Sequence, residues 1–305
     1  MTPATRRVAV GAVLGAAAAL WLSPAYSHAV CGDRIFPATL GIDDPGVSDE
    51  LALPTLTYLP QNSDGVAETD ASFSWTKTIV PGLGLSVSDG ATWLHPGGYG
   101  WDSLDTELKY NFFCLPDHEF MGSVGFDVEW ADTASSAQQT PFNTYSPVID
   151  IGKGLGDLPK SLNILRPFAI TAELSASVPS LSWIDGGQNP TTLNYGFTIQ
   201  YSLPYFNSHI GQIDNPFLKH LVPIAEFTFS RPIANTPPGA QVTTGTFQPG
   251  LVYMADTWQV ALEAIVPLNS ASGSGTGVVA ELHFFLDDMF PNTIGKPIFT
   301  SLRGD

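Results

Sequence analysis

The chain has 305 residues, of which only 13% are charged, and its 29 acidic residues outnumber its 12 lysines and arginines to give a net charge of −17. With 44% hydrophobic residues the chain is too apolar for intrinsic disorder, and so few cations cannot build the basic surface that nucleic-acid binding requires. Beyond residue 22 no apolar run reaches the roughly 18 residues of a membrane-spanning helix, which excludes a polytopic helical membrane protein.

The N-terminus has the three parts of a secretory signal peptide. Arg6 and Arg7 precede the apolar run VAVGAVLGAAAALWL over 8–22, and small residues follow at Ser27 and Ala29. We therefore predict that residues 1–29 are a signal peptide cleaved after Ala29, with a retained membrane anchor as the alternative. Export places the mature chain outside the cytoplasm, where disulfides persist.

Residues 30–50 precede the first predicted strand, and we expect them to form a periplasmic or plug segment. They contain Cys31, and the second cysteine of the chain is Cys114. Cys31 is close to the mature N-terminus and Cys114 ends a predicted strand at a periplasmic turn, so both fall on one side of the membrane. We predict a Cys31–Cys114 disulfide, with a pair of free buried thiols as the alternative.

From residue 51 onward, apolar and polar residues alternate in segments that are separated by clusters of Gly, Pro, Asn, Asp and Ser. In 103–114, for example, Leu104 and Leu108 share one face, and Asp105 and Glu107 share the other. A period of two predicts β-strands, and no segment of similar length has the 3.6-residue period of a helix. The predicted strands are 51–58, 69–80, 83–94, 103–114, 119–131, 142–153, 165–178, 191–203, 219–231, 243–253, 256–267 and 276–287.

Such strands fit either a soluble β-sandwich or a transmembrane β-barrel. They are about twice as long as ordinary soluble strands and match the roughly 9–11 tilted residues that cross a membrane. Aromatic residues end the apolar faces, as in the interfacial girdle of membrane barrels: Trp75, Trp93, Trp130, Tyr195, Tyr201 and Trp258. We therefore predict an all-β fold, an antiparallel up-and-down transmembrane β-barrel over 51–290 in the bacterial outer membrane.

The connections indicate twelve strands. Single-chain bacterial barrels have an even number of strands, with short periplasmic turns and longer extracellular loops. The connection 204–219 departs from this rule, because it is long and yet falls on the periplasmic side. Pro54 would suit only an edge strand or the start of a strand, so the first strand is the least certain and ten strands is the alternative. Residues 291–305 form a C-terminal extension.

The polar face of the strands would line the lumen of this barrel. Its candidate residues are mostly acidic: Asp105, Glu107, Lys109, Asp127, Glu129, Asp150, Glu173, Glu226, Glu263, Glu281 and His283. Carboxylates along a lumen favour cations or neutral solutes and repel anions.

Four of these carboxylates form a candidate cation patch. If Cys114 lies opposite Phe120, Asp105 faces Glu129, and Glu107 faces Asp127. Lys109 neutralises about one of these charges, and the remainder would take up protons or bind a cation such as Ca²⁺ through hard oxygen ligands. The alternative is a register shifted by two residues, with water screening the acids.

The sequence offers no clear motif for catalysis or for a cofactor. GKGLG at 152–156 lacks the GK[ST] of a P-loop and the GxGxxG order, so it is interpreted as a glycine turn between two strands. The histidines after residue 29 have neither HxxxH nor HxH spacing, which argues against a zinc site. His283 with Glu281 would shuttle protons, bind metal or simply form a hydrated wall. We predict no enzymatic activity and no cofactor.

Several short motifs resemble a group of bacterial outer-membrane proteins. They are GDRIFPATLGIDDPGVSDELALP at 32–54, the strand with TKTI at 76–79, GKGLGDLP at 152–159 and LRPFAIT at 165–171. Over most of its mature length the chain is similar to the "MetA-pathway of phenol degradation" transporter-like family, whose members are barrels found near degradation genes. The resemblance implies uptake of small, rather apolar aromatic compounds. The chain departs from the standard barrel ending, because fifteen residues follow Phe290, the aromatic that would close the last strand.

These observations predict a narrow outer-membrane channel or transporter for small solutes with an acidic lumen. Its expected partners are outer-membrane lipid, a small-molecule solute and the barrel-assembly machinery, and no nucleic acid. Two alternatives stay open. One is a plugged, non-transporting barrel with a structural or surface-interaction role, and the other is a secreted soluble β-sandwich that binds a ligand.

Overall fold

A computed structural model of the chain describes residues 29–135, 140–184 and 186–299. The signal peptide predicted over 1–29 lies outside these residues, apart from Ala29. Twelve long strands account for most of the described chain: β3 (Glu50–Leu59), β4 (Ala67–Val80), β5 (Leu83–His95), β7 (Asp105–Leu115), β8 (Phe120–Glu129), β9 (Thr144–Gly154), β10 (Phe168–Pro179), β13 (Thr191–Tyr201), β14 (Leu221–Ala234), β15 (Thr244–Met254), β16 (Trp258–Pro267) and β17 (Gly277–Phe285).

The twelve long strands form a closed ring. Each pairs antiparallel with the next long strand along the chain, and β17 pairs with β3 to close the barrel. The predicted twelve-stranded up-and-down barrel is confirmed, and the alternatives of ten strands and of a soluble sandwich are wrong. Short strands decorate the ring: β6 (Tyr99–Trp101) pairs with β5, and β11 (Trp183–Ile184) pairs with β12 (Gly187–Gln188). Within the described ranges, no helix is long and apolar enough to cross a membrane.

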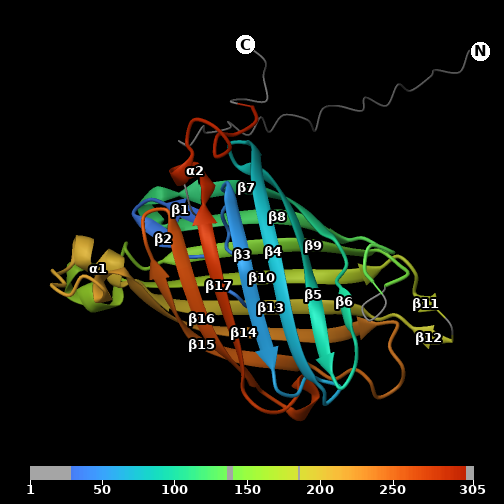
Figure 1. The fold of residues 1–305 in the computed structure, drawn as a ribbon. Helices are drawn as coiled ribbons and strands as arrows, with labels where there is room; N and C mark the ends of the chain where they lie inside the picture. The colour runs from blue at the N-terminus through green and yellow to red at the C-terminus, as the bar shows by residue number, and fades with distance from the viewer. Residues whose placement is uncertain (1–28, 136–139, 185, 300–305) are drawn as a thin grey trace, which may run out of the picture.

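The two ends of the barrel differ (Figure 1). One end carries the hairpin of β1 (Ala29–Cys31) and β2 (Arg34–Phe36), called the rim hairpin below, together with α1 (Leu203–His209) and α2 (Leu286–Met289). The other end carries β6, β11 and β12. Short turns face the periplasm in outer-membrane barrels, so the end with the rim hairpin is called the periplasmic end. The long connection that contains α1 lies at this end, as the alternation of the strands requires.

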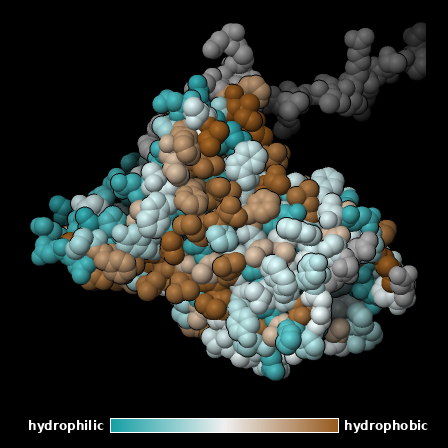
Figure 2. Space-filling view, in the orientation of Figure 1, coloured by the Kyte–Doolittle hydropathy of each residue, from teal (hydrophilic) through white to brown (hydrophobic). Residues whose placement is uncertain are grey.

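The strand alternation separates an apolar outside from a polar inside. On neighbouring strands, Leu108, Phe126 and Ile149 are 46%, 48% and 49% exposed, whereas Lys109 and Asp150 are 6% and 0% exposed. Figure 2 shows the result as a hydrophobic band across the barrel with more hydrophilic surface at both ends. A closed barrel with such a band satisfies every ladder hydrogen bond internally and presents hydrocarbon to lipid. The protein is therefore an outer-membrane β-barrel.

Pro54 lies inside β3, where a bulge accommodates it. The register shifts between Ala52 and Thr55 on the β4 side, and between Glu281 and His283 on the β17 side. Because a bulge takes a residue out of the ladder, the missing N–H of proline costs no ladder hydrogen bond. The expectation that Pro54 suits only an edge or a strand start is wrong, since β3 is paired on both sides.

The C-terminal extension folds back onto the periplasmic end of β4. The amides of Ile298 and Phe299 donate to the carbonyls of Thr78 and Ile79 at 3.1 and 2.8 Å. Lys77 Nζ donates to the carbonyl oxygen of Ile294 at 3.0 Å. The chain therefore passes the end of β17 and covers the neighbouring strands instead of ending at the barrel wall.

Candidate functional site

Residues 37–49, called the lumen segment, cross the inside of the barrel. The segment begins beside β16, where Gln259 Nε2 donates to the carbonyl of Ala38 at 2.8 Å. It passes β7, where Asn111 Nδ2 donates to the carbonyl of Pro45 at 3.1 Å. It ends beside β4, where the amide of Thr78 donates to Asp49 Oδ1 at 3.1 Å. Of the region 30–50 that the sequence assigns to a periplasmic or plug segment, the hairpin therefore lies at the rim and 37–49 lies in the lumen.

Apolar contacts fix the start of the lumen segment. Ile35 and Leu40 pack on a group of buried, inward-facing residues: Val222, Ile224, Val252, Met254 and Ala261. Phe36 packs in a second cluster with Ala29, Cys31, Met121 and Ala169. Phe36 is 1% exposed, and burying an apolar side chain of this size contributes about 1.5–3 kcal/mol, so the start of the segment is firmly attached to the wall.

One disulfide ties the rim hairpin to the barrel. Cys31 is bonded to Cys114 near the periplasmic end of β7, with a Cα–Cα distance of 5.8 Å. The pairing is the one that the sequence predicts. The bond closes a loop with a sequence separation of 83 residues, which includes the whole lumen segment.

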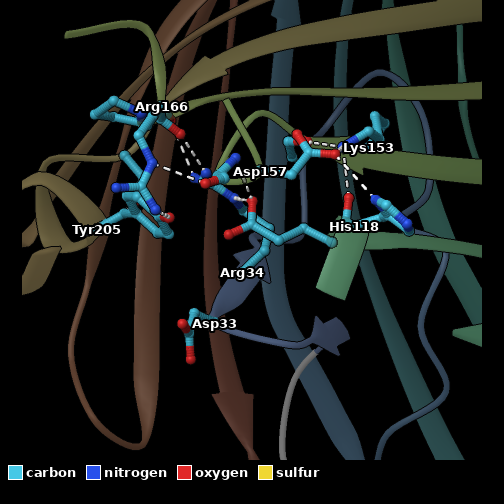
Figure 3. A network of polar contacts seen from close by, with 12 residues as sticks. Asp33, Arg34, His118, Lys153, Asp157, Arg166 and Tyr205 are labelled. Carbon is cyan, nitrogen blue, oxygen red and sulfur yellow. Dashed lines mark hydrogen bonds and ion pairs between the residues drawn. The ribbon is translucent and has the colours of Figure 1, made fainter. Parts of the chain in front are cut away.

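A buried arginine holds the rim hairpin from the other side (Figure 3). The side chain of Arg34 is 1% exposed, and its Nε donates to Glu119 Oε2 at 3.0 Å. Its Nη1 donates to the carbonyl of Pro167 at 3.0 Å, and its guanidinium carbon lies 4.0 Å from the ring centroid of Tyr205. Burial lowers the pKa of Arg34, and the Glu119 carboxylate acts in the opposite direction. Removing either partner of such a pair leaves a buried charge without compensation.

The glycine-rich motif at 152–156 receives the Glu119 carboxylate. The amide of Gly156 donates to Glu119 Oε2 at 3.0 Å, and the amide of Gly154 donates to the Glu119 carbonyl at 2.9 Å. The sequence interpretation of this motif as a simple glycine turn misses this role, which depends on a residue on another strand connection.

An exposed ion-pair cluster lies next to this network (Figure 3). Asp157 Oδ2 lies 3.0 Å from Lys153 Nζ and 3.3 Å from His118 Nδ1. Burial would raise the pKa of Asp157, but its hydrogen bonds with Lys153 and His118 outweigh this effect and lower the pKa. Exposed pairs of this kind contribute at most about 1 kcal/mol, so the cluster adds little to stability.

The predicted lumen residues all have the inward parity of their strands. Cross-strand partners share a face, and the pairs Asp105–Glu129, Glu107–Asp127 and Glu173–Asp150 are in register. Five of the predicted lumen residues are deeply buried: Asp150, Glu226, Glu263, Lys109 and His283. The structure brings most of these residues into three groups along the lumen segment and leaves the others nearer the extracellular end.

The first group binds the lumen segment through its backbone. Glu226 Oε2 accepts from the amides of Leu40 and Gly41 at 3.1 and 2.6 Å. Glu263 Oε1 accepts from the same Leu40 amide at 3.3 Å. Thr198 Oγ1 donates to Glu226 Oε1 at 2.6 Å. These two wall carboxylates are therefore used to seat the segment.

The second group surrounds Lys109. Its Nζ is hydrogen-bonded to Asp43 Oδ2 of the lumen segment, donates to the carbonyl of Asp44 at 3.1 Å, and lies 3.3 Å from Asp150 Oδ2. From β10, Glu173 Oε2 accepts from the Asp43 amide at 3.0 Å. Sequence reasoning did not single out Asp43, since the expected periplasmic or plug segment over 30–50 does not indicate which of its residues would contact which wall residue.

The third group centres on His283. Its Nδ1 lies 3.0 Å from Glu281 Oε1, and its Nε2 lies 3.1 Å from Glu50 Oε2. Thr55 Oγ1 donates to Glu281 Oε2 at 2.8 Å. The sequence paired His283 with Glu281 and missed Glu50, because the predicted strand began one residue later. Glu50 lies two residues before the inward-facing Ala52, so the alternation of the strand would have placed Glu50 on the inner face.

The four carboxylates of the candidate cation patch are paired as predicted, but the turn next to them has a different register from the one assumed. Asp105 pairs with Glu129, and Glu107 with Asp127, but Cys114 pairs with Met121 and not with Phe120. A bulge between Asn111 and Phe113 shifts the register by one residue near the turn. In the part of the chain that the structure describes, no group of three or more His, Cys, Asp or Glu side chains is arranged to hold a metal ion.

Two cavities lie toward the extracellular end of the lumen. One, of about 250 Å³, is lined by Ser72, Ser88, Asp89, Asp102, Asp105 and Glu281 among others. The other, of about 340 Å³, is lined by residues such as Glu129, Phe142, Ser177 and Asn189. Burial raises the pKa of Asp102, which lies in the loop before β7; a hydrogen bond from Thr92 opposes this effect, and repulsion from neighbouring carboxylates adds to it. The extracellular half of the lumen thus has cavities large enough for water and more acidic than basic side chains.

Solved structures with a similar arrangement of strands share little sequence with this chain. "KdgM porin" is 13% identical with a TM-score of 0.46, and its alignment covers 77% of this chain and 98% of that one. A structure described as a NanC porin is 10% identical with a TM-score of 0.49 and the same coverage. LpxR from Salmonella typhimurium is 11% identical with a TM-score of 0.43, covering 77% of this chain and 99% of its own. Neither a protein-family model nor a curated protein matches the sequence, so its resemblance to the MetA-pathway family is not confirmed.

Proposed function

We propose that this protein is an outer-membrane channel for small solutes. The observation that carries the proposal is the acidic extracellular half of the lumen, where Asp105, Asp127 and Glu129 face inward and Asp105 and Glu129 line cavities. Fixed carboxylates in a narrow aqueous path attract cations and repel anions. The channel would therefore pass small cations or neutral solutes in preference to anions.

The lumen segment lies across the path that a solute would take through the barrel. It touches the wall from β16 to β4, and its contacts with Glu226, Glu263 and Lys109 are buried or partly buried. A solute that enters from outside would meet the segment at the level of Asp43. Transport then requires the segment to shift while the Cys31–Cys114 disulfide keeps its start at the rim.

The same contacts favour a second candidate, a permanently plugged barrel with a structural or surface-interaction role. Hydrogen bonds from Leu40 and Gly41 to buried carboxylates are charge-assisted, and bonds of this type are worth about 1.5–3 kcal/mol each. If these bonds never open, the extracellular cavities are only a hydrated recess.

Conductance of the purified full-length barrel in a planar lipid bilayer distinguishes the two candidates. We expect discrete current steps with a reversal potential that shows cation preference. Glu129→Gln removes one charge at the extracellular mouth and should shift the reversal potential toward that of an unselective channel. Asp64→Asn, in an exposed turn outside the lumen, is the matched control and should leave it unchanged. A folded barrel that gives no current steps would support the plugged barrel instead.

The uptake of small aromatic compounds, which the sequence resemblance implies, is a narrower hypothesis within the same function. It predicts that phenol and similar neutral aromatics swell proteoliposomes containing the barrel faster than polar solutes of equal size. Equal swelling rates for both kinds of solute would leave size and charge as the selection criteria.

A further inference from the structure

Asp43 makes two contacts of opposite polarity inside the barrel. Its backbone N–H donates to Glu173 Oε2 at 3.0 Å, and its carboxylate Oδ2 is hydrogen-bonded to Lys109 Nζ. Glu173 is on β10 and Lys109 is on β7, so two different strands of the wall hold Asp43. One residue of the lumen segment thus presents an N–H donor to an anion and a carboxylate to a cation.

Lys109 takes some of its partners from the lumen segment and others from the wall. The residue is 6% exposed, and a buried ammonium group needs anionic or polar partners to offset its lost hydration. Two of its partners, the Asp43 carboxylate and the Asp44 carbonyl, belong to the segment, while Asp150 belongs to the wall. When the segment leaves this level, Lys109 faces the lumen with room for another carboxylate.

Two acids of the same wall, Asp150 on β9 and Glu173 on β10, lie close to Lys109 around the barrel. Asp150 and Glu173 are directly paired across β9 and β10, so their side chains are neighbours on the inner face. Asp150 is fully buried, and its Oδ2 accepts from Ser123 Oγ at 3.1 Å and lies 3.3 Å from Lys109 Nζ. Its Oδ1 has no hydrogen-bond partner. The backbone of Asp43 supplies one N–H here, whereas an ammonium group supplies three. An ammonium group would therefore serve Glu173 and also the acceptor on Asp150 that the segment leaves unpaired.

This level of the lumen is accessible to solvent. The side chain of Asp43 is 54% exposed, although the lysine that it contacts is almost fully buried. Water in the lumen therefore reaches the carboxylate side of the pair. A small solute arriving through the acidic extracellular half would meet this position first.

We propose that Lys109, Glu173 and Asp150 form a subsite for a small zwitterion of the amino acid type, and that Asp43 occupies this subsite while the lumen segment is seated. The carboxylate of the solute binds Lys109, and its ammonium group binds Glu173 and Asp150. The nitrogen and the carboxylate of Asp43 are separated by two carbon atoms, which is the spacing in β-alanine. The inference rests on the proposed channel function, for which it names a class of solute.

Calorimetric titration of the purified, detergent-solubilised full-length barrel with β-alanine tests the subsite. Asp43→Ala removes the carboxylate that competes for Lys109 and leaves only the backbone N–H against Glu173, which the ammonium group of the solute displaces. It should therefore bind β-alanine at least tenfold more tightly than the wild type. Asp64→Ala, at an exposed turn, is the matched control and should bind as the wild type does. Propionate lacks the ammonium group and propylamine lacks the carboxylate, so each should bind the Asp43→Ala barrel at least tenfold more weakly than β-alanine.

Two further variants assign the ends of the solute. In the Asp43→Ala background, Lys109→Met should abolish the preference for β-alanine over propylamine, and Glu173→Gln should abolish the preference over propionate. If Lys109→Met fails to fold, as judged by loss of the heat-dependent shift in gel mobility, Glu173→Gln still decides the matter. Equal binding of propylamine and β-alanine by the Asp43→Ala barrel would overturn the proposal in favour of a general cation-attracting wall.

The failure of the subsite and the failure of the channel are distinguishable. Calorimetry detects binding without any need for conduction, and bilayer current detects conduction without any need for β-alanine. A barrel that conducts but whose Asp43→Ala variant binds no β-alanine overturns the subsite and leaves the channel standing. A barrel that binds β-alanine as expected but never conducts retains the site and refutes the channel.

Discussion

The carboxylate of Glu119 lies directly against the backbone of Gly156. The Gly156 amide donates to Glu119 Oε2 at 3.0 Å, and a Cβ at Gly156 would lie 1.9 Å from Glu119 Oε1 and 2.4 Å from the hydroxyl of Tyr205. Because Glu119 is also the partner of buried Arg34, its side chain has little freedom to give way. The glycine thus permits the ion pair that anchors the rim hairpin.

Gly156→Ala should destabilise the barrel by displacing this ion pair. Overpacking at a close contact costs about 1–3 kcal/mol, and we expect a loss of this size in urea unfolding in detergent micelles. Gly187→Ala is the matched control, since its Cβ would meet the carbonyl of Ile184 at an ordinary 3.4 Å. Equal losses for both variants would show that the close approach of Glu119 is not what requires a glycine.

Glu226→Gln should loosen the lumen segment without opening the barrel wall. The change replaces a carboxylate that accepts from the amides of Leu40 and Gly41 by a neutral amide with one acceptor fewer. A hydrogen bond to a charged group is worth about 1.5–3 kcal/mol, so amide hydrogen exchange at 40–41 should accelerate about 10- to 100-fold. Glu129→Gln, at the extracellular end, is the control. Unchanged exchange in Glu226→Gln would mean that the apolar contacts of Leu40 alone hold the segment.

The sequence is most informative where one rule acts along a whole strand. The alternation of apolar and polar residues located the twelve long strands to within three residues at each end, because one face must meet lipid and the other must not. Interactions between distant segments leave no such pattern. The bulge beside Phe113, the position of Asp43 against Lys109 and the seat of Glu119 on Gly156 each depend on which segments meet in space. The disulfide was predictable because the chain has only two cysteines.

Asp287, in the first turn of α2, should make stability depend on pH. Burial, and then the carboxylates of Asp288 and Glu50, raise the pKa of Asp287 to about 7. In the unfolded chain the same group ionises near pH 4. The folded form therefore loses stability as pH rises from about 4 to about 7, and the full penalty applies above that range.

Asp287→Asn should remove this penalty. The variant keeps the side-chain oxygen that accepts from the Asp288 amide at 3.1 Å. We expect it to be more stable than the wild type by on the order of 2 kcal/mol at pH 8 and equally stable at pH 3. Urea unfolding at both pH values measures the difference, with Asp64→Asn as the control. Parallel stability curves for Asp287→Asn and the wild type would argue against a buried, neutral Asp287.

Like charges face each other across β7 and β8 near the extracellular end, and relieving them should stabilise the barrel. Asp105 is paired with Glu129, and Glu107 with Asp127, while Lys109 is engaged with Asp43 and Asp150 and lies 4.0 Å from Glu107. Facing charges of the same sign destabilise a strand pair, and each such cross-strand interaction is worth about 0.2–1 kcal/mol. Asp105→Asn/Asp127→Asn leaves one charge in each pair, so the melting temperature in detergent should rise by a few degrees at low salt, and the gain should shrink at high salt as the repulsion is screened. Asp64→Asn/Asp117→Asn changes two exposed acids elsewhere and is the matched control.

The same measurement tests the cation patch that the sequence predicted. Because no group of three metal-binding side chains occurs among the described residues, millimolar Ca²⁺ should leave the melting temperature of the wild type unchanged. A rise with Ca²⁺ that disappears in Asp105→Asn/Asp127→Asn but persists in the control would instead establish that the four carboxylates bind the ion.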